Sequence, residues 1–300
     1  MFISNIDNPG KAMERRGKLR TDTLFLIPAM VFVLMSELVP IVYTTYLGFM
    51  DWDIINPPKW AGISNYVKVF STPELINALK NTIYWVLGTL IFAVAFPLFI
   101  AALLNRVKRR TIFKLIFFIP STLSPTVAAI FWRRTLASQK GALVSLLDLF
   151  GVQIQPILTN PQINTFVMIG VWVWQFFGIN LILFLVGLET IPQEPVEAAM
   201  IDGANPRQAF FRIILPLLKP ISMLVIANAL INSIRMFDIP WVMIQGGPGR
   251  ASETLAISLY RESFLLFKMG LGSAIAVVIS IMTLLASYRY ILTLGKGRRA

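Results

Sequence analysis

The sequence predicts an all-α membrane protein that crosses the bilayer about six times. The chain has 300 residues, of which 56% are hydrophobic, and its mean hydropathy is +0.70. Charged residues make up only 14% of the chain, and they gather in clusters between long uncharged stretches. A helix needs about 20 apolar residues to cross a hydrocarbon core of roughly 30 Å, because each residue rises about 1.5 Å.

Six stretches meet this requirement and together define a transmembrane domain over residues 24–293. The predicted spans are 24–49, 76–104, 112–132, 163–188, 221–244 and 271–292. Prolines at positions 28, 40, 97 and 125 lie in or near these spans, and neighbouring helices can satisfy the backbone groups that such kinks free. The first apolar run is too long for the core of a signal peptide, so we expect a retained span.

Positive charge is distributed unevenly between the two sides of these spans, and this predicts the orientation. The segments before span one, between spans two and three, between spans four and five, and after span six, counted together with Lys114 and Arg289 at the adjoining span ends, hold 17 of the 27 Lys and Arg residues. Positive loops remain in the cytoplasm, so residues 1–23, 191–220 and 294–300 are predicted to be cytoplasmic. The net charge of +12 therefore fits a membrane protein in contact with lipid better than a nucleic-acid-binding protein.

The composition also excludes several kinds of active site. The chain has no cysteine and no histidine, which rules out thiol nucleophiles, disulfides and imidazole acid–base chemistry and argues against zinc. No paired acidic motif supports an intramembrane enzyme, and no G-x-x-x-x-G-K-[ST] phosphate-binding loop is present. We therefore expect no catalytic residues, no metal site and no ATP hydrolysis in this chain.

The loop 191–220 has the pattern of two short helices set at an angle. Pro195 suits the first turn of a helix, where the missing N–H has no helical partner to lose. Gly203 can adopt the left-handed conformation that ends a helix. Asn205 then caps a second helix that has Pro206 at its first position.

The surface of this helix pair is small and apolar for a cytoplasmic segment. Ala198, Ala199 and Ala204 allow another protein to approach closely, and Phe210 and its neighbours are apolar. Apolar helix faces of this kind bind in grooves of partner proteins, but an ordinary amphipathic connector would look similar. The residues alone leave both interpretations open.

A longer pattern in the same loop resembles a known family signature. Glu197-Ala198-Ala199, followed at fixed spacing by Gly203, Ile213 and Leu215-Pro216, resembles the EAA signature of bacterial binding-protein-dependent ABC importers, and Asp202, Ala204 and Phe210 fit its fuller form. The similarity extends along most of the chain and points to the permeases of maltose-type carbohydrate uptake. Further matching positions are Gly62, Asn65-Tyr66, Asn81-Thr82, Pro120, Trp132 and Gly246-Gly247-Pro248.

The resemblance implies partners and a location. In this family the EAA helices fit a cleft in a cytoplasmic ATPase, and a dimer of such ATPases binds ATP and Mg. A second homologous permease, more often non-identical, completes the pore, and an extracytoplasmic solute-binding protein delivers the ligand. The expected location is the cytoplasmic or inner membrane of a bacterium or archaeon. The maltose permease itself has extra spans and a large periplasmic insertion, for which the outer loops here are too short, so maltose specificity does not carry over.

Polar residues within two predicted spans are candidates for substrate contact. Asn228, Asn232 and Arg235 occupy one helical face of span five, and Asp238 could pair with Arg235. Span four offers Trp172, Gln175 and Phe176, and the corresponding faces line a mid-membrane substrate site in the maltose-type family. Amide and guanidinium groups suit sugar hydroxyls, and aromatic faces pack on sugar rings.

Each of these residues also has an interpretation without a substrate. Intramembrane asparagines often join helices by hydrogen bonds, Arg235 could extend towards water, and Trp172 could serve packing. The leading hypothesis is a permease subunit that imports an oligosaccharide or related polyol by alternating access. The alternatives are a glycerol-phosphate or acidic-sugar permease, or an ion-coupled secondary transporter, which would favour inverted repeats and matching broken helices.

Overall fold

The computed structural model describes residues 24–105, 107, 110–137, 141–151 and 157–296. Within this part of the chain, five helices are long and apolar enough to cross a membrane, and a bent helix pair makes a sixth crossing if it is counted as one span. The all-α, polytopic prediction is confirmed. The five single helices are Leu24–Leu47, Pro73–Leu104, Asn164–Glu189, Lys219–Ile244 and Met269–Tyr288.

The third predicted span, 112–132, is a broken helix rather than a continuous one. It consists of α6 (Arg110–Phe118), the 3-10 turn η3 (Ile119–Thr122) and α7 (Pro125–Thr135), and its two halves meet at 94°. Pro120 lies in the turn and Pro125 begins α7, so two backbone N–H groups are missing where a straight helix would need them. Ser124 is extended, as residues before proline prefer, and its side chain caps α7 by accepting from the Val127 N–H.

Other boundaries differ from the prediction by a few residues. The second span begins at Pro73 rather than 76, because proline is favourable in the first turn of α4 (Pro73–Thr89). The last helix, α16 (Met269–Lys296), continues into the segment 294–300 that was predicted to be a tail. The predicted N-terminal segment, 1–23, lies outside the described residues.

Three widened π-helical turns each precede a proline. They end two residues before Pro40, Pro97 and Pro216, and they are η1 (Leu34–Leu38), η2 (Leu90–Ala95) and η4 (Phe210–Ile214). Proline has no N–H and its ring crowds the carbonyl four residues earlier, which a wider turn relieves. In the second span the freed carbonyl of Ala93 accepts a hydrogen bond from the Asn180 side chain at 2.5 Å.

The central helix of the bundle is α9 (Asn164–Glu189). It packs against α4, α5 (Phe96–Leu104), α6 and α13 (Lys219–Ile234), and α13 packs in turn against α4 and α16. Leu181 and Phe184 are fully buried in this core. Gly178 permits the close approach of α6, because a Cβ at this position would overlap the carbonyl oxygen of Phe117.

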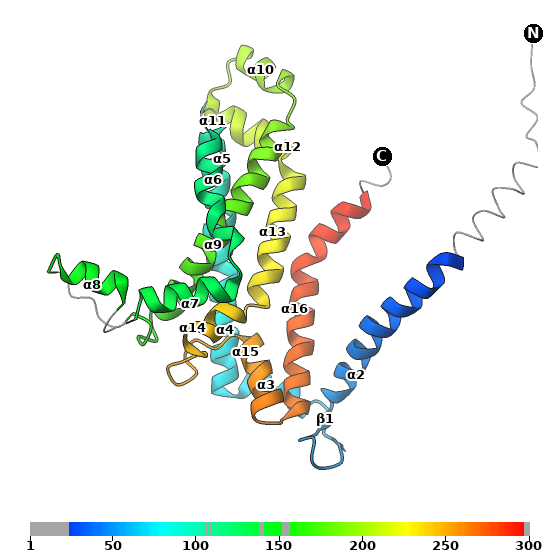
Figure 1. Ribbon diagram of the computed structural model, residues 1–300. Coiled ribbons are helices and arrows are strands. Elements are labelled where there is room, and N and C mark those ends of the chain that lie inside the picture. The colour runs from blue at the N-terminus through cyan, green and yellow to red at the C-terminus, as the bar shows by residue number, and fades with distance from the viewer. Residues whose placement is uncertain (1–23, 106, 108–109, 138–140, 152–156, 297–300) are drawn as a thin grey trace, which may run out of the picture.

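Loops and short elements gather at two opposite ends of the bundle (Figure 1). One end, called the tip below, carries α10 (Glu194–Ile201), α11 (Pro206–Ala209), η4 and α12 (Leu215–Leu217). The other end carries β1 (Met50–Asp51), β2 (Lys59–Trp60), α3 (Ser64–Ser71), α14 (Asp238–Ile244), α15 (Leu255–Tyr260) and η5 (Arg261–Leu265). The two strands pair antiparallel, with Met50 opposite Trp60.

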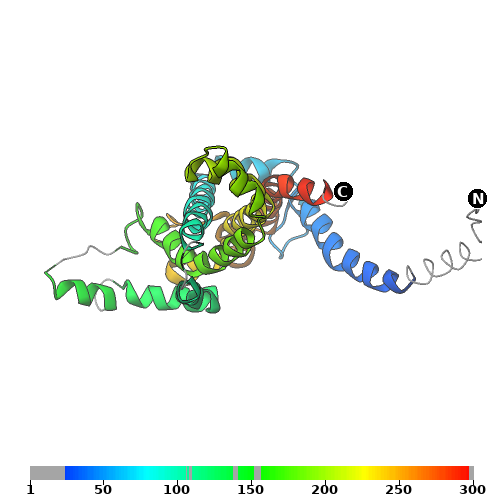
Figure 2. The same cartoon turned by 90° about the horizontal axis from the view of Figure 1, so that it is seen from above.

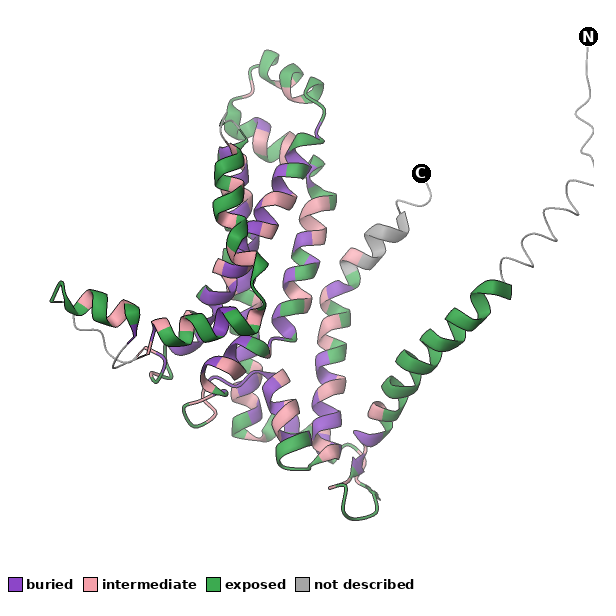
Figure 3. Ribbon diagram, in the orientation of Figure 1, coloured by how far each residue is buried: buried purple, intermediate pink, exposed green. Residues whose placement is uncertain are grey.

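The first span projects away from the bundle. Figure 2 shows it on one side, while α8 (Ala142–Asp148) projects on the other. The most apolar stretch of the first span is 0% buried. The first span remains exposed until its last part, α2 (Val39–Leu47), approaches β1 (Figure 3). An apolar surface of this size faces either lipid or another membrane protein.

Candidate functional site

Two short helices form the tip, as the spacing of prolines and glycine predicts. Gly203, which follows α10, has φ of +89°. Asn205 Oδ1 accepts a hydrogen bond from Gln208 N at 2.9 Å, and Gln208 Oε1 accepts one from Asn205 N at 2.9 Å. This reciprocal cap, with Pro206 in the first turn, sets the start of α11. The predicted left-handed glycine and asparagine cap are confirmed.

All the residues predicted to couple to an ATPase lie on the tip. Ala204 N donates to Ala199 O at 2.9 Å and closes the turn between the two helices, and the rings of Phe210 and Phe211 meet edge to face at 5.3 Å. Glu197, Ala198, Asp202 and Gly203 are exposed, whereas Ala199, Ala204 and Phe210 are half-buried.

The tip also exposes large apolar side chains. Ile201 is 87% exposed, Met200 54% and Phe211 55%, and Figure 3 shows exposed residues covering α10. The tip lies at one end of the spans, where water or another protein surrounds it rather than the hydrocarbon core. Several apolar side chains exposed together in this way are typical of a surface that contacts another protein.

A second candidate site is a cavity of about 350 Å³ where α9, α13 and α14 meet the start of α7. Trp172 and Phe176 contribute an aromatic wall, with their ring centroids 4.7 Å apart and their planes at 24°. Asn232 and Arg235 add an amide and a guanidinium to the same cavity. The full lining is Pro125, Trp172, Phe176, Asn232, Arg235, Met236, Phe237 and Asp238.

Arg235 and Asp238 share the cavity without forming the ion pair that the sequence suggested. α13 ends at Ile234, so Arg235 is already outside the helix, and Asp238 begins α14 after a turn. The spacing that brings residues i and i+3 together requires a continuous helix. Neither side chain has a hydrogen bond or ion pair to another described residue, so both remain available to a ligand.

Comparison with known proteins identifies the family. Residues 93–294 match the family described as binding-protein-dependent transport system inner membrane component, and this match includes both the tip and the cavity. The chain belongs to this family. It is therefore a multi-pass permease component of a membrane transport system.

Two curated relatives match this permease over most of its length. The probable ABC transporter permease protein YesP of Bacillus subtilis (strain 168) is 34% identical over 293 residues, covering 93% of this permease and 94% of that protein. The arabinooligosaccharides transport system permease protein AraP of the same organism is 35% identical over 268 residues, covering 88% and 85%.

A solved structure has the same fold. It is a chain of a bacterial alginate ABC transporter in complex with an alginate pentasaccharide-bound periplasmic protein. The TM-score is 0.76 at 22% identity, and the superposition covers 93% of this permease and 95% of that chain. At this identity the likeness establishes the fold alone.

Two of the predicted substrate residues of the permease lie outside the cavity lining. Gln175 is 1% exposed, and its Nε2 donates to Leu123 O at 2.7 Å, while Ser121 Oγ donates to Gln175 O at 2.8 Å. Gln175 therefore joins α9 to the break in the third span. Asn228 offers its backbone carbonyl to Asn232 Nδ2 at 2.8 Å but does not line the cavity.

The sequence-based search missed a cluster of buried charges at the end opposite the tip. Glu253 is 0% exposed and accepts hydrogen bonds from Arg250, Ser258 and Arg261. Burial alone would lower the pKa of Arg250, but hydrogen bonds and charges from Glu253 and Glu262 outweigh this effect and raise the pKa above its usual value. The acidic and basic residues were visible in the sequence, but only the fold brings them together.

Proposed function

We propose that this permease is one membrane-spanning subunit of an ATP-driven importer that moves a carbohydrate across the membrane. The observation that carries the proposal is the tip, an ordered helix pair that exposes apolar side chains and displays the whole EAA pattern. Its relatives support this assignment, because AraP is described as part of an arabinooligosaccharide transport system. ATP and Mg would bind to the partner ATPases and not to this chain.

The tip is suited to transmit movement because short segments join it to two spans. α10 follows α9 after the short segment 190–193, and η4 and α12 lead from α11 into α13. Leu218, at the junction with α13, is 1% exposed and packs in the same buried cluster as Leu188 and Ile191. Movement of an ATPase cleft around the tip would therefore displace both α9 and α13, which carry the cavity.

The cavity has the chemistry of a sugar site. The Trp172–Phe176 wall offers an aromatic face for a pyranose or furanose ring, Asn232 and Arg235 donate hydrogen bonds, and Asp238 accepts them. Because neither Arg235 nor Asp238 is engaged by another described side chain, sugar hydroxyls can replace the water around these two groups. In the proposed cycle the movement of α13 exposes this wall to one side of the membrane at a time.

The exposed first span and the shape of the cavity favour a second permease. A cavity lined by only part of the bundle is open, and a homologous subunit would close it. We infer a non-identical partner, together with two ATPase subunits beneath the tip and an extracytoplasmic solute-binding protein at the other end. This arrangement implies that both termini are cytoplasmic.

One observation favours a second candidate substrate class. Arg235 has no carboxylate partner among the described residues, and an unpaired guanidinium recognises carboxylate or phosphate with two parallel hydrogen bonds. An acidic sugar or a glycerol-phosphate compound would meet this requirement, although Asp238 in the same cavity would oppose a second negative charge on the ligand.

Co-purification of an ATPase tests the proposed function directly. Wild-type permease, purified from its host in mild detergent, should carry an ATPase with a phosphate-binding loop. Ile201→Glu places a charge on the apolar tip and should reduce the bound ATPase at least about tenfold, because loss of a hot-spot residue near the centre of an interface costs about 2 kcal/mol or more. Ile55→Glu is the matched control, since Ile55 is 85% exposed at the opposite end and Ile201 is 87% exposed.

Either of two results would overturn the proposal. The wild-type permease could be isolated without any ATPase, or Ile201→Glu could retain as much ATPase as Ile55→Glu. The first result would direct attention to uptake driven by an ion gradient.

A further inference from the structure

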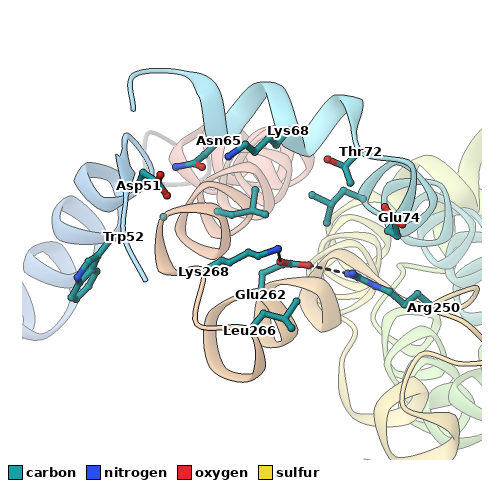
Figure 4. A pocket seen from close by; sticks show the side chains of 13 residues that line it. Asp51, Trp52, Asn65, Lys68, Thr72, Glu74, Arg250, Glu262, Leu266 and Lys268 are labelled. Atoms are coloured by element: carbon teal, nitrogen blue, oxygen red, sulfur yellow. Dashed lines mark hydrogen bonds and ion pairs between the residues drawn. The ribbon is translucent and has the colours of Figure 1, made fainter. Parts of the chain in front are cut away.

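A charged cleft of about 450 Å³ lies at the end of the permease opposite the tip. It is formed where β1, α3 and the start of α4 meet η5 and the start of α16 (Figure 4). Acidic and basic side chains from β1, α3, α4 and η5, and from the loops that carry Arg250 and Lys268, line it. The charged residues of the lining are Asp51, Lys68, Glu74, Arg250, Glu262 and Lys268.

Glu262 is the buried group of this cleft. Its side chain is 5% exposed, and Oε1 lies 3.2 Å from Arg250 Nη2. Oε2 is buried and has no hydrogen-bond partner in the described part of the chain. Lys268 Nζ is 3.7 Å from Oε2, which is close enough for an ion pair but too far for a hydrogen bond. A buried carboxylate oxygen is costly to leave in this condition.

The basic neighbours of Glu262 do not donate a hydrogen bond to its Oε2. Arg250 is shared, because its Nη2 also lies 2.9 Å from Glu253 Oε2, and Glu253 is fixed by Arg261 and Ser258. The Lys268 side chain is 60% exposed and can swing into water at little cost. A donor from outside could therefore take the place beside Oε2.

The rim of the cleft carries further unused carboxylates. Asp51 and Glu74 are exposed, and neither carboxylate has a hydrogen bond or ion pair to another described residue. Among the described residues that line the cleft, Lys68 is the one basic residue whose side chain has no hydrogen bond or ion pair. The available groups of the cleft are thus two free carboxylates and one unsatisfied buried oxygen against one free ammonium group, which favours a cationic occupant.

We propose that this cleft receives a lysine or arginine side chain of the extracytoplasmic solute-binding protein. The inference rests on the proposed function, which places the cleft on the outer face. The incoming cation donates to Glu262 Oε2, displaces Lys268 and is flanked by Glu74 and Asp51. The cleft is also tied to the spans, because Asn77 and Asn81 of α4 donate to the carbonyl of Ala251, beside Arg250.

The affinity of the solute-binding protein for the transporter tests whether the cleft receives this side chain. The probe is the solute-binding protein that co-purifies with the wild-type complex, titrated onto the complex in nanodiscs. The double variant Asp51→Lys with Glu74→Lys should raise the Kd about tenfold, because charge reversal opposes a cation. Asp148→Lys is the control, since Asp148 is exposed outside the cleft and should change the Kd less than about twofold. Retained ATPase would verify that the variants fold.

Cross-linking locates the contact independently. The chain has no cysteine, so Glu74→Cys and Asp148→Cys each offer one site for a benzophenone maleimide. Light should join the solute-binding protein to position 74 and not to position 148.

The outcomes separate this inference from the proposed function. If the wild-type permease carries neither an ATPase nor a solute-binding protein, the proposed function and the inference fail together. The complex could instead capture a solute-binding protein whose Kd for the double variant equals that for wild type or for Asp148→Lys. In that case the cleft does not receive the cation, and only this inference fails.

Discussion

Asn180 illustrates how single side chains maintain helices that contain proline. Pro97 cannot donate to Ala93 O, and Asn180 Nδ2 on the neighbouring helix donates instead. The residue is 7% exposed, so water cannot replace it. An unsatisfied carbonyl in such surroundings costs about 1–3 kcal/mol, although interhelical hydrogen bonds in membranes often contribute less than this.

We therefore expect Asn180→Leu to destabilise the permease by about 1–2 kcal/mol. Pro97→Ala restores a backbone N–H that can reach Ala93 O, so the same Asn180→Leu change should cost less in that background. Unfolding of the four variants in detergent, read as a double-mutant cycle, measures this coupling. Equal costs in both backgrounds would show that Asn180 does not act through the freed carbonyl.

The residues that line the cavity could be predicted from the sequence only where they lie within a continuous helix. Trp172, Phe176 and Asn232 lie where helical periodicity places them. Gln175 belongs to the same helix but is engaged by the broken third span, a partner that the sequence of span four does not reveal. Arg235 lines the cavity from a turn, because α13 ends at Ile234, whereas the predicted span continued to residue 244.

At the scale of elements, hydrophobic length predicts the spans well. Five of the six predicted spans correspond to long apolar helical stretches in the described chain, and the fifth of the six is interrupted by a turn at residues 235–237. The break in the third span depends on two prolines five residues apart together with a capping serine, and a hydropathy window averages over all three. The glycine-based turn and capped helix of the tip were predictable because their conformations are local and have few alternatives.

Close packing of α6 on α9 leads to a prediction at this scale. Gly178→Ala places a methyl group against the backbone of Phe117, so the helices must separate, at a cost of about 1–3 kcal/mol. Gly170 lies in the same helix with nothing within 4 Å of an added Cβ. Gly170→Ala should therefore be neutral or slightly stabilising, since alanine favours helix over glycine.

Thermal unfolding of the two variants in the same detergent decides between these expectations. A lower Tm for Gly178→Ala alone would verify that this glycine sets the distance between the helices. If both variants had the same Tm as wild type, the close approach of α6 to α9 would not contribute to stability.

At the scale of the whole molecule, the permease is asymmetric along its length. The tip exposes apolar side chains on short helices, the middle holds an aromatic and polar cavity, and the far end has a network of buried charges. The exposed first span faces lipid or another membrane protein, and the open cavity is compatible with the proposed second permease. Hydropathy could predict neither the separation of the first span from the bundle nor the open cavity, because it does not distinguish a helix facing lipid from one facing another subunit.

The central claim is that the tip couples ATP hydrolysis to the spans, and the stimulation of hydrolysis by the solute-binding protein tests it most directly. Gly203→Val forces a β-branched residue into φ of +89°, with nothing within 4 Å of an added Cβ, so the change acts on backbone conformation. Gly151→Val is the matched control, because Gly151 has φ of +73° and is equally unobstructed.

We expect the solute-binding protein to accelerate ATP hydrolysis by the wild-type complex and by Gly151→Val. In Gly203→Val this stimulation should fall at least about tenfold, in line with the loss of a central contact. Stimulation of Gly203→Val equal to that of wild type would contradict coupling through the tip.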